Sequence, residues 1–440
     1  MVYYTSLLST ICLFLLLGSA TPSLVRCKSP QQPYDAKGLM LDQVVKLGPY
    51  PDRDNELCTA LGAHLLAAQR SLRPPNVDIV LQAEKSVAAN PGLFTTDARG
   101  NNWLTVGSNR WSAGRFQTLQ VKYLRRQASL HQKDAKDKHP GRPVPRLRLW
   151  LLVGSTVATD IGALQATAGK DALFQVASQF NCLESTGPRQ LVPVHEYFTD
   201  NTQGPRAAIG AFPGALLRHY RATSIESHGR PFVQVTDGQQ VNLLDEVVDR
   251  STKVVENGYF TGEHATNIPK LAKTIQDKED LIKVGVHSNV QVVLGANWHG
   301  HVEGSPLITQ VLTSAVAGGY YQGQRFLGNY FPQISSSLLR AAYKGTLYAA
   351  ASEGMRKAVL TMIGGGAFSN DVGTIWEAIG VALDEVKPVL SNDLDVFINI
   401  RNMDELTRRV ATQQVLERVR RFGGGIIRFE DGGKISIERY

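Results

Sequence analysis

The chain has 440 residues, of which 43% are hydrophobic and 20% are charged, with only 20 prolines. This composition is typical of one large globular body or of two domains, and it excludes a small disulfide scaffold and a low-complexity chain. The formal net charge of +8 is modest for this length and does not indicate nucleic-acid binding. Nearly the whole excess lies between Lys122 and Arg148, where nine Lys or Arg residues face two Asp residues.

The first 20 residues have the pattern of a secretory signal peptide. An apolar run at residues 7–17 precedes the small residues Gly18, Ser19 and Ala20, which suit cleavage after Ala20. The run is short for a membrane span, and no later run approaches 18 apolar residues. We therefore expect a secreted or secretory-lumen protein with no stable membrane insertion after cleavage. The alternatives are an uncleaved anchor and a mis-assigned start.

Three cysteines remain after the predicted cleavage: Cys27, Cys58 and Cys182. An odd number allows at most one intramolecular bridge. The most plausible pair is Cys27 with Cys58, which leaves Cys182 free.

Residues 21–145 form a predicted N-terminal extension, mainly helical, without a motif of known chemistry. Leucine spacing predicts a helix within residues 44–70, and the Gly, Asn and Thr content of residues 90–111 predicts loops. Residues 127–145 combine Lys, His and Asp with three prolines and are typical of a flexible basic loop. Such a loop is either simply solvated or the contact for an anionic partner.

From Arg146 onward the pattern changes to strands that alternate with helices, which predicts a mostly parallel, three-layer α/β sheet in a domain of residues 146–440. In such sheets ligands bind at the carboxyl ends of the strands. The predicted strands are residues 147–153, 172–177, 291–295, 358–363 and 395–400, and the predicted helices are residues 206–220, 241–257, 307–317, 335–353 and 374–386.

Two junctions between a strand and a helix have the features of phosphate-binding loops. Thr202, Gln203 and Gly204 stand directly before a helix, where unpaired N–H groups and the positive end of the helix dipole attract anions. Residues 364–366 are three consecutive glycines after a β-branched run, and they allow backbone amides to approach a ligand closely. Neither junction carries a Walker lysine or a Gly-x-Gly-x-x-Gly turn, so a P-loop NTPase and an ordinary dinucleotide oxidoreductase are excluded.

These loops together resemble those of a known family. Asn181 closes one strand, residues 202–209 run through a glycine into an Ala-Ile helix, and residues 363–370 read Ile-Gly-Gly-Gly-Ala-Phe-Ser-Asn. The combination is similar to macrodomains, and more closely to the divergent branch near poly(ADP-ribose) glycohydrolases. That branch includes bacterial effector hydrolases that act on ADP-ribosylated ubiquitin. The resemblance covers roughly residues 146–400.

The resemblance implies a three-layer α/β/α macrodomain-like mixed sheet that binds ADP-ribose without a cofactor. It implies that the early Asn holds the distal ribose, that the first glycine loop passes under that ribose, and that the late loop wraps the diphosphate with its aromatic residue against the ribose. The ligand-binding residues predicted on this basis are Asn181, Thr202, Gln203, Gly204, Gly364, Gly365, Gly366, Ala367, Phe368 and Asn370.

The sequence departs from the pattern of poly(ADP-ribose) glycohydrolases at the position of the catalytic carboxylates. Those enzymes place paired glutamates after the first glycine loop. Here residues 203–206 read Gln-Gly-Pro-Arg, so cleavage of poly(ADP-ribose) chains is not expected. Breaking a glycosidic bond to ribose needs a carboxylate or an activated water near the anomeric carbon. The candidates are Asp200 and Asp371, with Asp395 as a third. Each has a structural alternative: the first two as helix caps and Asp395 as a solvated side chain.

Two other features of the sequence give weaker evidence of a functional site. His299 and His301 are spaced i, i+2 without a Cys or carboxylate set, so no metal site is predicted. Cys182 has no partner histidine in any motif and is interpreted as a small core residue rather than a nucleophile.

The leading hypothesis is a secreted macrodomain-like ADP-ribosylhydrolase that removes ADP-ribose from modified protein side chains. Its partners would be ADP-ribose or an ADP-ribosylated protein, and no nucleic acid. The alternative is a non-catalytic module that binds ADP-ribose or a related nucleotide, and a third hypothesis is a hydrolase of another nucleotide-like ligand.

Overall fold

The computed structural model describes residues 23–27, 40–47, 53–70, 76–154, 157–223, 227, 229–295, 298, 302, 304–430 and 433–440. The predicted signal peptide and the residues His299 and His301 lie outside this part of the chain.

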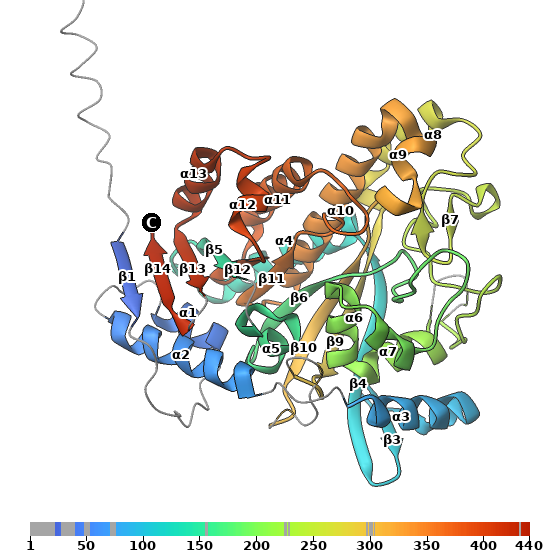
Figure 1. The fold of residues 1–440 in the computed structure, drawn as a ribbon, viewed down its shortest axis with the longest axis horizontal. Helices are drawn as coiled ribbons and strands as arrows, with labels where there is room; N and C mark the ends of the chain where they lie inside the picture. Colours follow the sequence, from blue (N-terminus) through green and yellow to red (C-terminus); the bar gives the residue numbers. More distant parts are fainter. Residues whose placement is uncertain are drawn as a thin grey trace, which may run out of the picture.

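One mixed sheet of twelve strands crosses the molecule (Figure 1), in the order β1-β14-β13-β5-β12-β11-β6-β10-β9-β4-β3-β2. The six central strands, from β13 to β10, are mutually parallel, and the strands at both sides are antiparallel. The strands are β1 Ser23–Cys27, β2 Phe94–Thr96, β3 Asn102–Val106, β4 Asn109–Gln120, β5 Leu147–Val153, β6 Ala172–Ala177, β9 Lys283–Gln291, β10 Leu307–Thr313, β11 Lys357–Thr361, β12 Leu394–Ile400, β13 Gly424–Phe429 and β14 Ile435–Arg439, with a separate pair β7 Val255–Glu256 and β8 Tyr259–Phe260.

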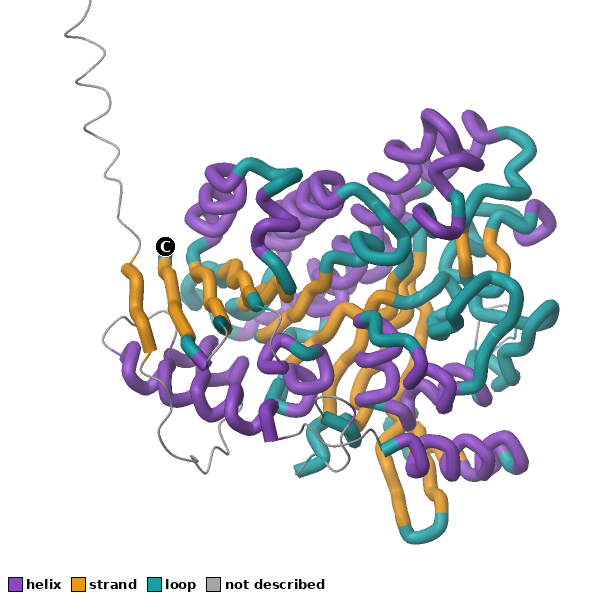
Figure 2. The backbone as a smooth tube through the Cα atoms, viewed as in Figure 1, coloured by secondary structure: helices purple, strands orange, loops and turns teal. Residues whose placement is uncertain are grey.

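Helices cover both faces of this sheet (Figure 2). In one layer, α10 contacts α4, α8 and α11. In the other layer, α5, α6 and α7 follow one another along the chain, and α3 packs against α7. The helices are α1 Met40–Leu47, α2 Asp54–Arg70, α3 Val77–Ala89, α4 Val121–Lys138, α5 Ile161–Ala166, α6 Gln203–Gly210, α7 Phe212–Tyr220, α8 Ile268–Asp277, α9 Gly323–Leu327, α10 Phe331–Ser352, α11 Val372–Val386, α12 Met403–Thr407 and α13 Thr412–Phe422. The predicted three-layer α/β architecture with a mostly parallel sheet is confirmed.

The core follows from the apolar pattern of the central strands. Every residue of β5 is buried, as is usual for a parallel strand covered on both faces. Trp150 on β5 and Trp376 on α11 are among the largest fully buried side chains. Since α10 is buried along most of its length, its Ala- and Leu-rich sequence serves as the central helix of its layer.

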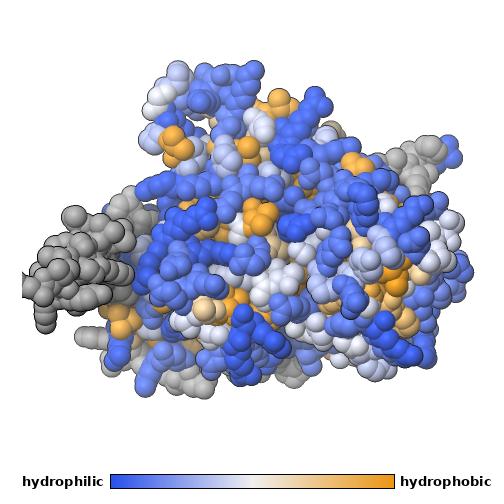
Figure 3. Space-filling model, turned by 90° about the horizontal axis from the view of Figure 1, so that it is seen from above, coloured by the Kyte–Doolittle hydropathy of each residue, from blue (hydrophilic) through white to orange (hydrophobic). Residues whose placement is uncertain are grey.

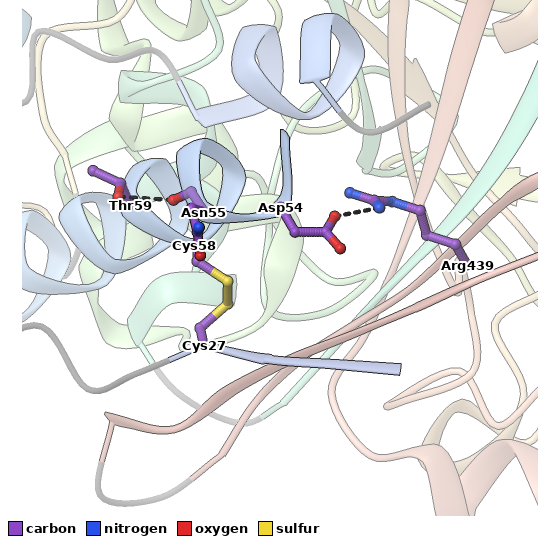
Figure 4. The surroundings of a disulfide bond; sticks show 6 residues. All are labelled: Cys27, Asp54, Asn55, Cys58, Thr59 and Arg439. Atoms are coloured by element: carbon purple, nitrogen blue, oxygen red, sulfur yellow. Dashed lines mark hydrogen bonds and ion pairs between the residues drawn. A yellow bond between two sulfur atoms is a disulfide. The ribbon is translucent and has the colours of Figure 1, made fainter. Parts of the chain in front are cut away.

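The N-terminal residues join the same sheet rather than forming a separate one. β1 adds to the edge strand β14, and β4 pairs with β9 on the other side. The predicted disulfide is confirmed: Cys27 on β1 is bonded to Cys58 on α2 (Figure 4), and Cys182 is free and buried. An ion pair between Asp54 and Arg439 joins α2 to the end of β14 beside the disulfide (Figure 4).

Five sequence predictions about secondary structure are wrong. Of the strand predicted at residues 291–295, only Gln291 lies in a strand, as the last residue of β9. Residues 121–138 form helix α4 where a flexible basic loop was predicted from residue 127, because the prolines begin only at Pro140. Residues 90–111 contain β2, β3 and the start of β4 rather than loops alone. Residues 307–317 begin with strand β10 instead of a helix, and residues 241–257 form turns, a short 3-10 helix and β7.

The face seen from above in Figure 3 is mostly hydrophilic, with hydrophobic residues scattered over it. In the described residues no helix combines the length and the apolar character needed to cross a bilayer.

Candidate functional site

Three loops meet at the carboxyl ends of the adjacent strands β11, β6 and β10. The ends of β6 and β10 are joined by a hydrogen bond from Ser178 N to Thr313 O (2.8 Å). The loop after β10 is joined to the glycine loop after β11 by Gly318 N, which donates to Phe368 O at 3.1 Å. The loops predicted to bind a ligand therefore lie at one edge of the sheet.

β6 and β11 separate at this edge. Their pairing ends at Phe174 and Val359, whereas β11 continues beside β12 as far as Thr361. Divergence of neighbouring parallel strands opens the crevice in which α/β proteins bind ligands. The side chain of Gln203 replaces the lost strand partner: it accepts from Ala177 N at 2.8 Å and donates to Gln175 O at 3.1 Å.

Helix α6 begins directly against this opening. Thr202 is its N-cap and makes no side-chain capping bond, and Gln203 and Gly204 are the first helical residues. In the described part of the chain, their two backbone N–H groups have no hydrogen-bond acceptor. Gly204 permits this approach, since a Cβ there would lie 1.9 Å from Ala177 O. The positive end of α6 is thus brought to the split.

The glycine loop flanks the split on the side of β11. Gly364 has φ +73°, and a Cβ there would lie 2.7 Å from Asn370 Nδ2, so glycine is required. Gly365 N donates to Met362 O, which closes the turn. The N–H groups of Gly364, Gly366, Ala367 and Phe368 find no acceptor in the described residues, and Gly366 and Ala367 are exposed. Such open amides form a typical anion-binding loop.

Two predicted ligand residues hold this loop in place. Asn370 is buried, and its Nδ2 donates to Val316 O at 2.9 Å and to Gly364 O at 3.3 Å, while its Oδ1 accepts from Ser335 Oγ at 2.6 Å. Phe368 packs with Tyr259 and Tyr321, with ring centroids 5.6 and 5.5 Å away. We call Phe368, Tyr259 and Tyr321 the ring cluster; it forms an aromatic wall beside the amide-lined opening.

Asn181 is completely buried, and both ends of its side chain are used within the protein. Its Oδ1 accepts from Leu183 N at 3.1 Å, and its Nδ2 donates to Gln240 Oε1 at 3.1 Å. Gly258 lies over it so closely that a Cβ there would be 2.5 Å from Asn181 Oδ1. A ribose contact at Asn181 would therefore require Gln240 to move, and that role stays a prediction.

The two candidate catalytic carboxylates differ in position. Asp200 is half-buried just before α6; its Oδ1 accepts from Thr202 N at 2.8 Å. Burial is the main cause that raises the pKa of Glu184 and that of Tyr259, and the charge of Asp200 adds to both shifts. Asp371 is the exposed N-cap of α11, where its Oδ1 accepts from Thr374 N at 2.9 Å. Asp200 adjoins the site, whereas the contacts of Asp371 are those of a cap.

Sequence reasoning missed the buried carboxyl group of Glu184, which follows Asn181 in the loop after β6. The side chain is 3% exposed, and its Oε1 has no hydrogen-bond partner in the described residues. Its Oε2 lies 2.5 Å from the place where a Cβ on Gly204 would stand. Burial, and secondarily the charge of Asp200, hold the pKa of Glu184 well above its usual range, against the opposing effects of Ser178 and Arg218. The only sequence signal was an acid in an otherwise apolar loop.

The raised pKa favours the neutral form of the Glu184 carboxyl group, which lessens its competition with a bound anion for the positive end of α6. A carboxyl group with a raised folded-state pKa contributes stability below its unfolded pKa and loses it as pH rises through the folded pKa. Glu184→Gln, a neutral isostere, should therefore be at least as stable as the parent at pH 7. Its unfolding midpoint should also fall less between pH 5 and 8. Thermal melts across that range check this; a destabilised variant with an unchanged pH profile would show that Glu184 is ionised.

The described residues contain no group of three His, Cys, Asp or Glu side chains arranged to hold a metal ion.

Solved structures of poly(ADP-ribose) glycohydrolases are similar to the chain. The chain is similar to poly(ADP-ribose) glycohydrolase from Deinococcus radiodurans in complex with ADP-ribose, with 11% identity, a TM-score of 0.39 and coverage of 68% of this chain and 94% of that one. It is also similar to poly(ADP-ribose) glycohydrolase from Thermomonospora curvata, with 13% identity, a TM-score of 0.39 and coverage of 75% and 98%. No protein-family model and no curated protein matches the chain.

Fold and site together define a three-layer α/β protein with two sets of open backbone amides at the split between β6 and β11. Amides arranged in this way bind phosphate groups, and the neighbouring ring cluster can pack against a sugar or a base.

Proposed function

We propose that the chain binds ADP-ribose at this edge of the sheet and hydrolyses the bond that joins it to a modified protein side chain. The observation that carries the proposal is the pair of open amide sets, at Gln203 and Gly204 on α6 and at residues 364–368 in the glycine loop. A diphosphate placed between them would receive hydrogen bonds from both sides and the favourable field of the helix end. The choice of ADP-ribose among diphosphates rests on the sequence resemblance.

The ring cluster and Asp200 define the reacting end of the proposed ligand. With the diphosphate at the amides, the distal ribose would lie along Phe368, and its anomeric carbon would face the side of Asp200. The half-buried carboxylate of Asp200 can orient a water molecule and accept its proton as the C–O or C–N bond to the protein breaks. The hydroxyl group adds to the ribose, and the proton passes to the departing side chain. The buried side chain of Glu184 packs against the first turn of α6.

The second candidate is a non-catalytic module that binds the same ligand. One observation favours this candidate. Asp200 accepts a hydrogen bond from Thr202 N and Asp371 caps α11, so both carboxylates have a structural role that requires no catalysis.

Asp200→Asn and Asp371→Asn separate the two candidates. Loss of a general base typically lowers the rate by 10²–10⁴-fold. We expect Asp200→Asn to reduce kcat/KM on mono-ADP-ribosylated protein by about 100-fold or more, with an ADP-ribose Kd within about threefold of the parent. Asp371→Asn is the matched control and should retain turnover, since Asn is also a good N-cap. A parent protein that binds ADP-ribose but cleaves no Ser, Arg or Glu linkage would be a binding module.

We further propose that the protein acts outside the cell or in the secretory lumen. The apolar run at residues 7–17 and the disulfide between Cys27 and Cys58 support this, because such bonds persist in oxidising compartments.

A further inference from the structure

A large open pocket lies beside the ring cluster, outside the amide-lined site. Its volume is about 1350 Å³, above the usual range for a small-molecule site. Its walls come from the segments 186–190, 237–242, 248–258 and 320–322, together with Glu263 and Phe326. All four segments are loops or short secondary-structure elements. They lie near the ends of strands β6 and β10.

The pocket shares a wall with the proposed site. Tyr321 belongs to both the ring cluster and the pocket lining, and its hydroxyl donates to Thr186 O at 3.0 Å across the boundary. Gly258 and Gln240 also line the pocket, and they are the residues that cover Asn181. Tyr321 packs on Tyr259 at 4.9 Å and on Phe368 at 5.5 Å, so the pocket adjoins the ring cluster along which the distal ribose is proposed to lie.

The charge of the lining disfavours a polyanionic occupant. Three cationic and four anionic side chains face the pocket, a formal net charge of −1: Arg189, Arg250, Lys253, Asp237, Asp249, Glu256 and Glu263. A chain of ADP-ribose units carries two negative charges per unit and would be bound by a clearly positive surface. Interspersed charges of both signs, together with backbone polar groups, suit a polypeptide.

We propose that this pocket holds the polypeptide segment that surrounds the ADP-ribosylated side chain, so that a protein conjugate is bound more tightly than free ADP-ribose. The inference rests on the proposed function and specifies its substrate as a modified protein rather than a polymer of ADP-ribose. The ADP-ribose group lies at the amides, and the protein to which it is attached extends past Tyr321 into the pocket.

Gly187 allows a clean test. It lines the pocket, it lacks the positive φ that would demand glycine, and a Cβ there meets nothing within 4 Å. Gly187→Trp therefore places a bulky side chain at the pocket wall without a clash at the Cβ, and Gly187→Ala is the matched control. Affinities are measured for free ADP-ribose, for a mono-ADP-ribosylated transferase domain and for poly(ADP-ribose), all in the Asp200→Asn background to prevent turnover.

We expect the protein conjugate to bind at least fivefold more tightly than ADP-ribose, and Gly187→Trp to abolish this difference while leaving the Kd of ADP-ribose within twofold. Gly187→Ala should behave as the parent does. Equal affinities for conjugate and free ADP-ribose would overturn the proposal, as would an advantage that survives Gly187→Trp. Tighter binding of the polymer that is lost in Gly187→Trp would assign the pocket to poly(ADP-ribose) instead. If ADP-ribose itself does not bind, the proposed function has failed rather than the pocket assignment alone.

Discussion

Asp395→Ala is expected to lower the free energy of unfolding by about 3–5 kcal/mol, the usual cost of removing one partner from a buried ion pair. Asp395 on β12 is fully buried, and its carboxylate accepts from Arg148 Nε at 2.7 Å, Arg148 Nη2 at 2.5 Å and Trp150 Nε1 at 2.8 Å. Removal of the Asp395 carboxylate leaves the buried guanidinium of Arg148 with the more distant Asp393, at 3.4 Å, as its ion-pair partner. Urea titration followed by circular dichroism measures the change.

The matched control is Asp393→Ala, two residues away. Asp393 is about one-third exposed, forms ion pairs with Arg146 and Arg148 at 3.4 Å and accepts from Arg146 N at 2.8 Å, so its loss should cost about 1 kcal/mol, well below the cost at Asp395. Equal destabilisation by the two variants would contradict the view that Asp395 is a buried structural anchor. Asp395 was one of three carboxylates weighed from the sequence for catalysis. It lies near the amino end of its strand, at the opposite edge of the sheet from the site.

Gly204→Ala is expected to lower ADP-ribose affinity by more than tenfold and stability by about 1–3 kcal/mol, the usual cost of overpacking. The added Cβ would lie 1.9 Å from Ala177 O, a backbone atom that belongs to β6, and 2.5 Å from Glu184 Oε2. The start of α6 must therefore move away from the split, and its open N–H groups move with it. Thermal melts and titration with ADP-ribose check both effects.

Gly366→Ala is the control for stability. A Cβ at Gly366 meets nothing within 4 Å, and the residue is exposed, so the melting temperature should stay within about 1 °C of the parent's, because surface substitutions usually change stability little. If Gly204→Ala also melts as the parent does and binds ADP-ribose with the parent's affinity, α6 does not form one wall of the site.

The central sheet was predictable because its parallel strands have short β-branched and apolar runs. β5, β6, β11 and β12 were all recognised in this way, with boundaries within two residues. β10 was mistaken for a helix because the apolar run at its start, Leu307–Thr313, continues into Ala-rich residues, and apolar runs of that length fit either structure. Residues 241–257 have helix-like spacing of Val and Leu. In the structure those side chains are buried, but the backbone that carries them forms mainly turns.

The loops of the site were predictable from glycine placement, whereas the role of each side chain was not. Gly204 was recognised as part of an anion-binding helix start and Gly364 as a position of close backbone approach, and a Cβ at either would clash. The internal hydrogen bonds that Asn181, Gln203 and Asn370 make with partners 26 to 59 residues away are not specified by a local pattern. Glu184 was missed for the same reason, since only the folded chain shows its burial next to Gly204.

The most direct test of the account is calorimetric titration of residues 21–440 with ADP-ribose, with AMP and ribose 5-phosphate as control ligands. The open amides at α6 and in the glycine loop predict micromolar binding of ADP-ribose and at least tenfold weaker binding of either control, each of which has a single phosphate. The absence of heat with millimolar ADP-ribose, or equal affinity for all three ligands, would contradict the proposed site.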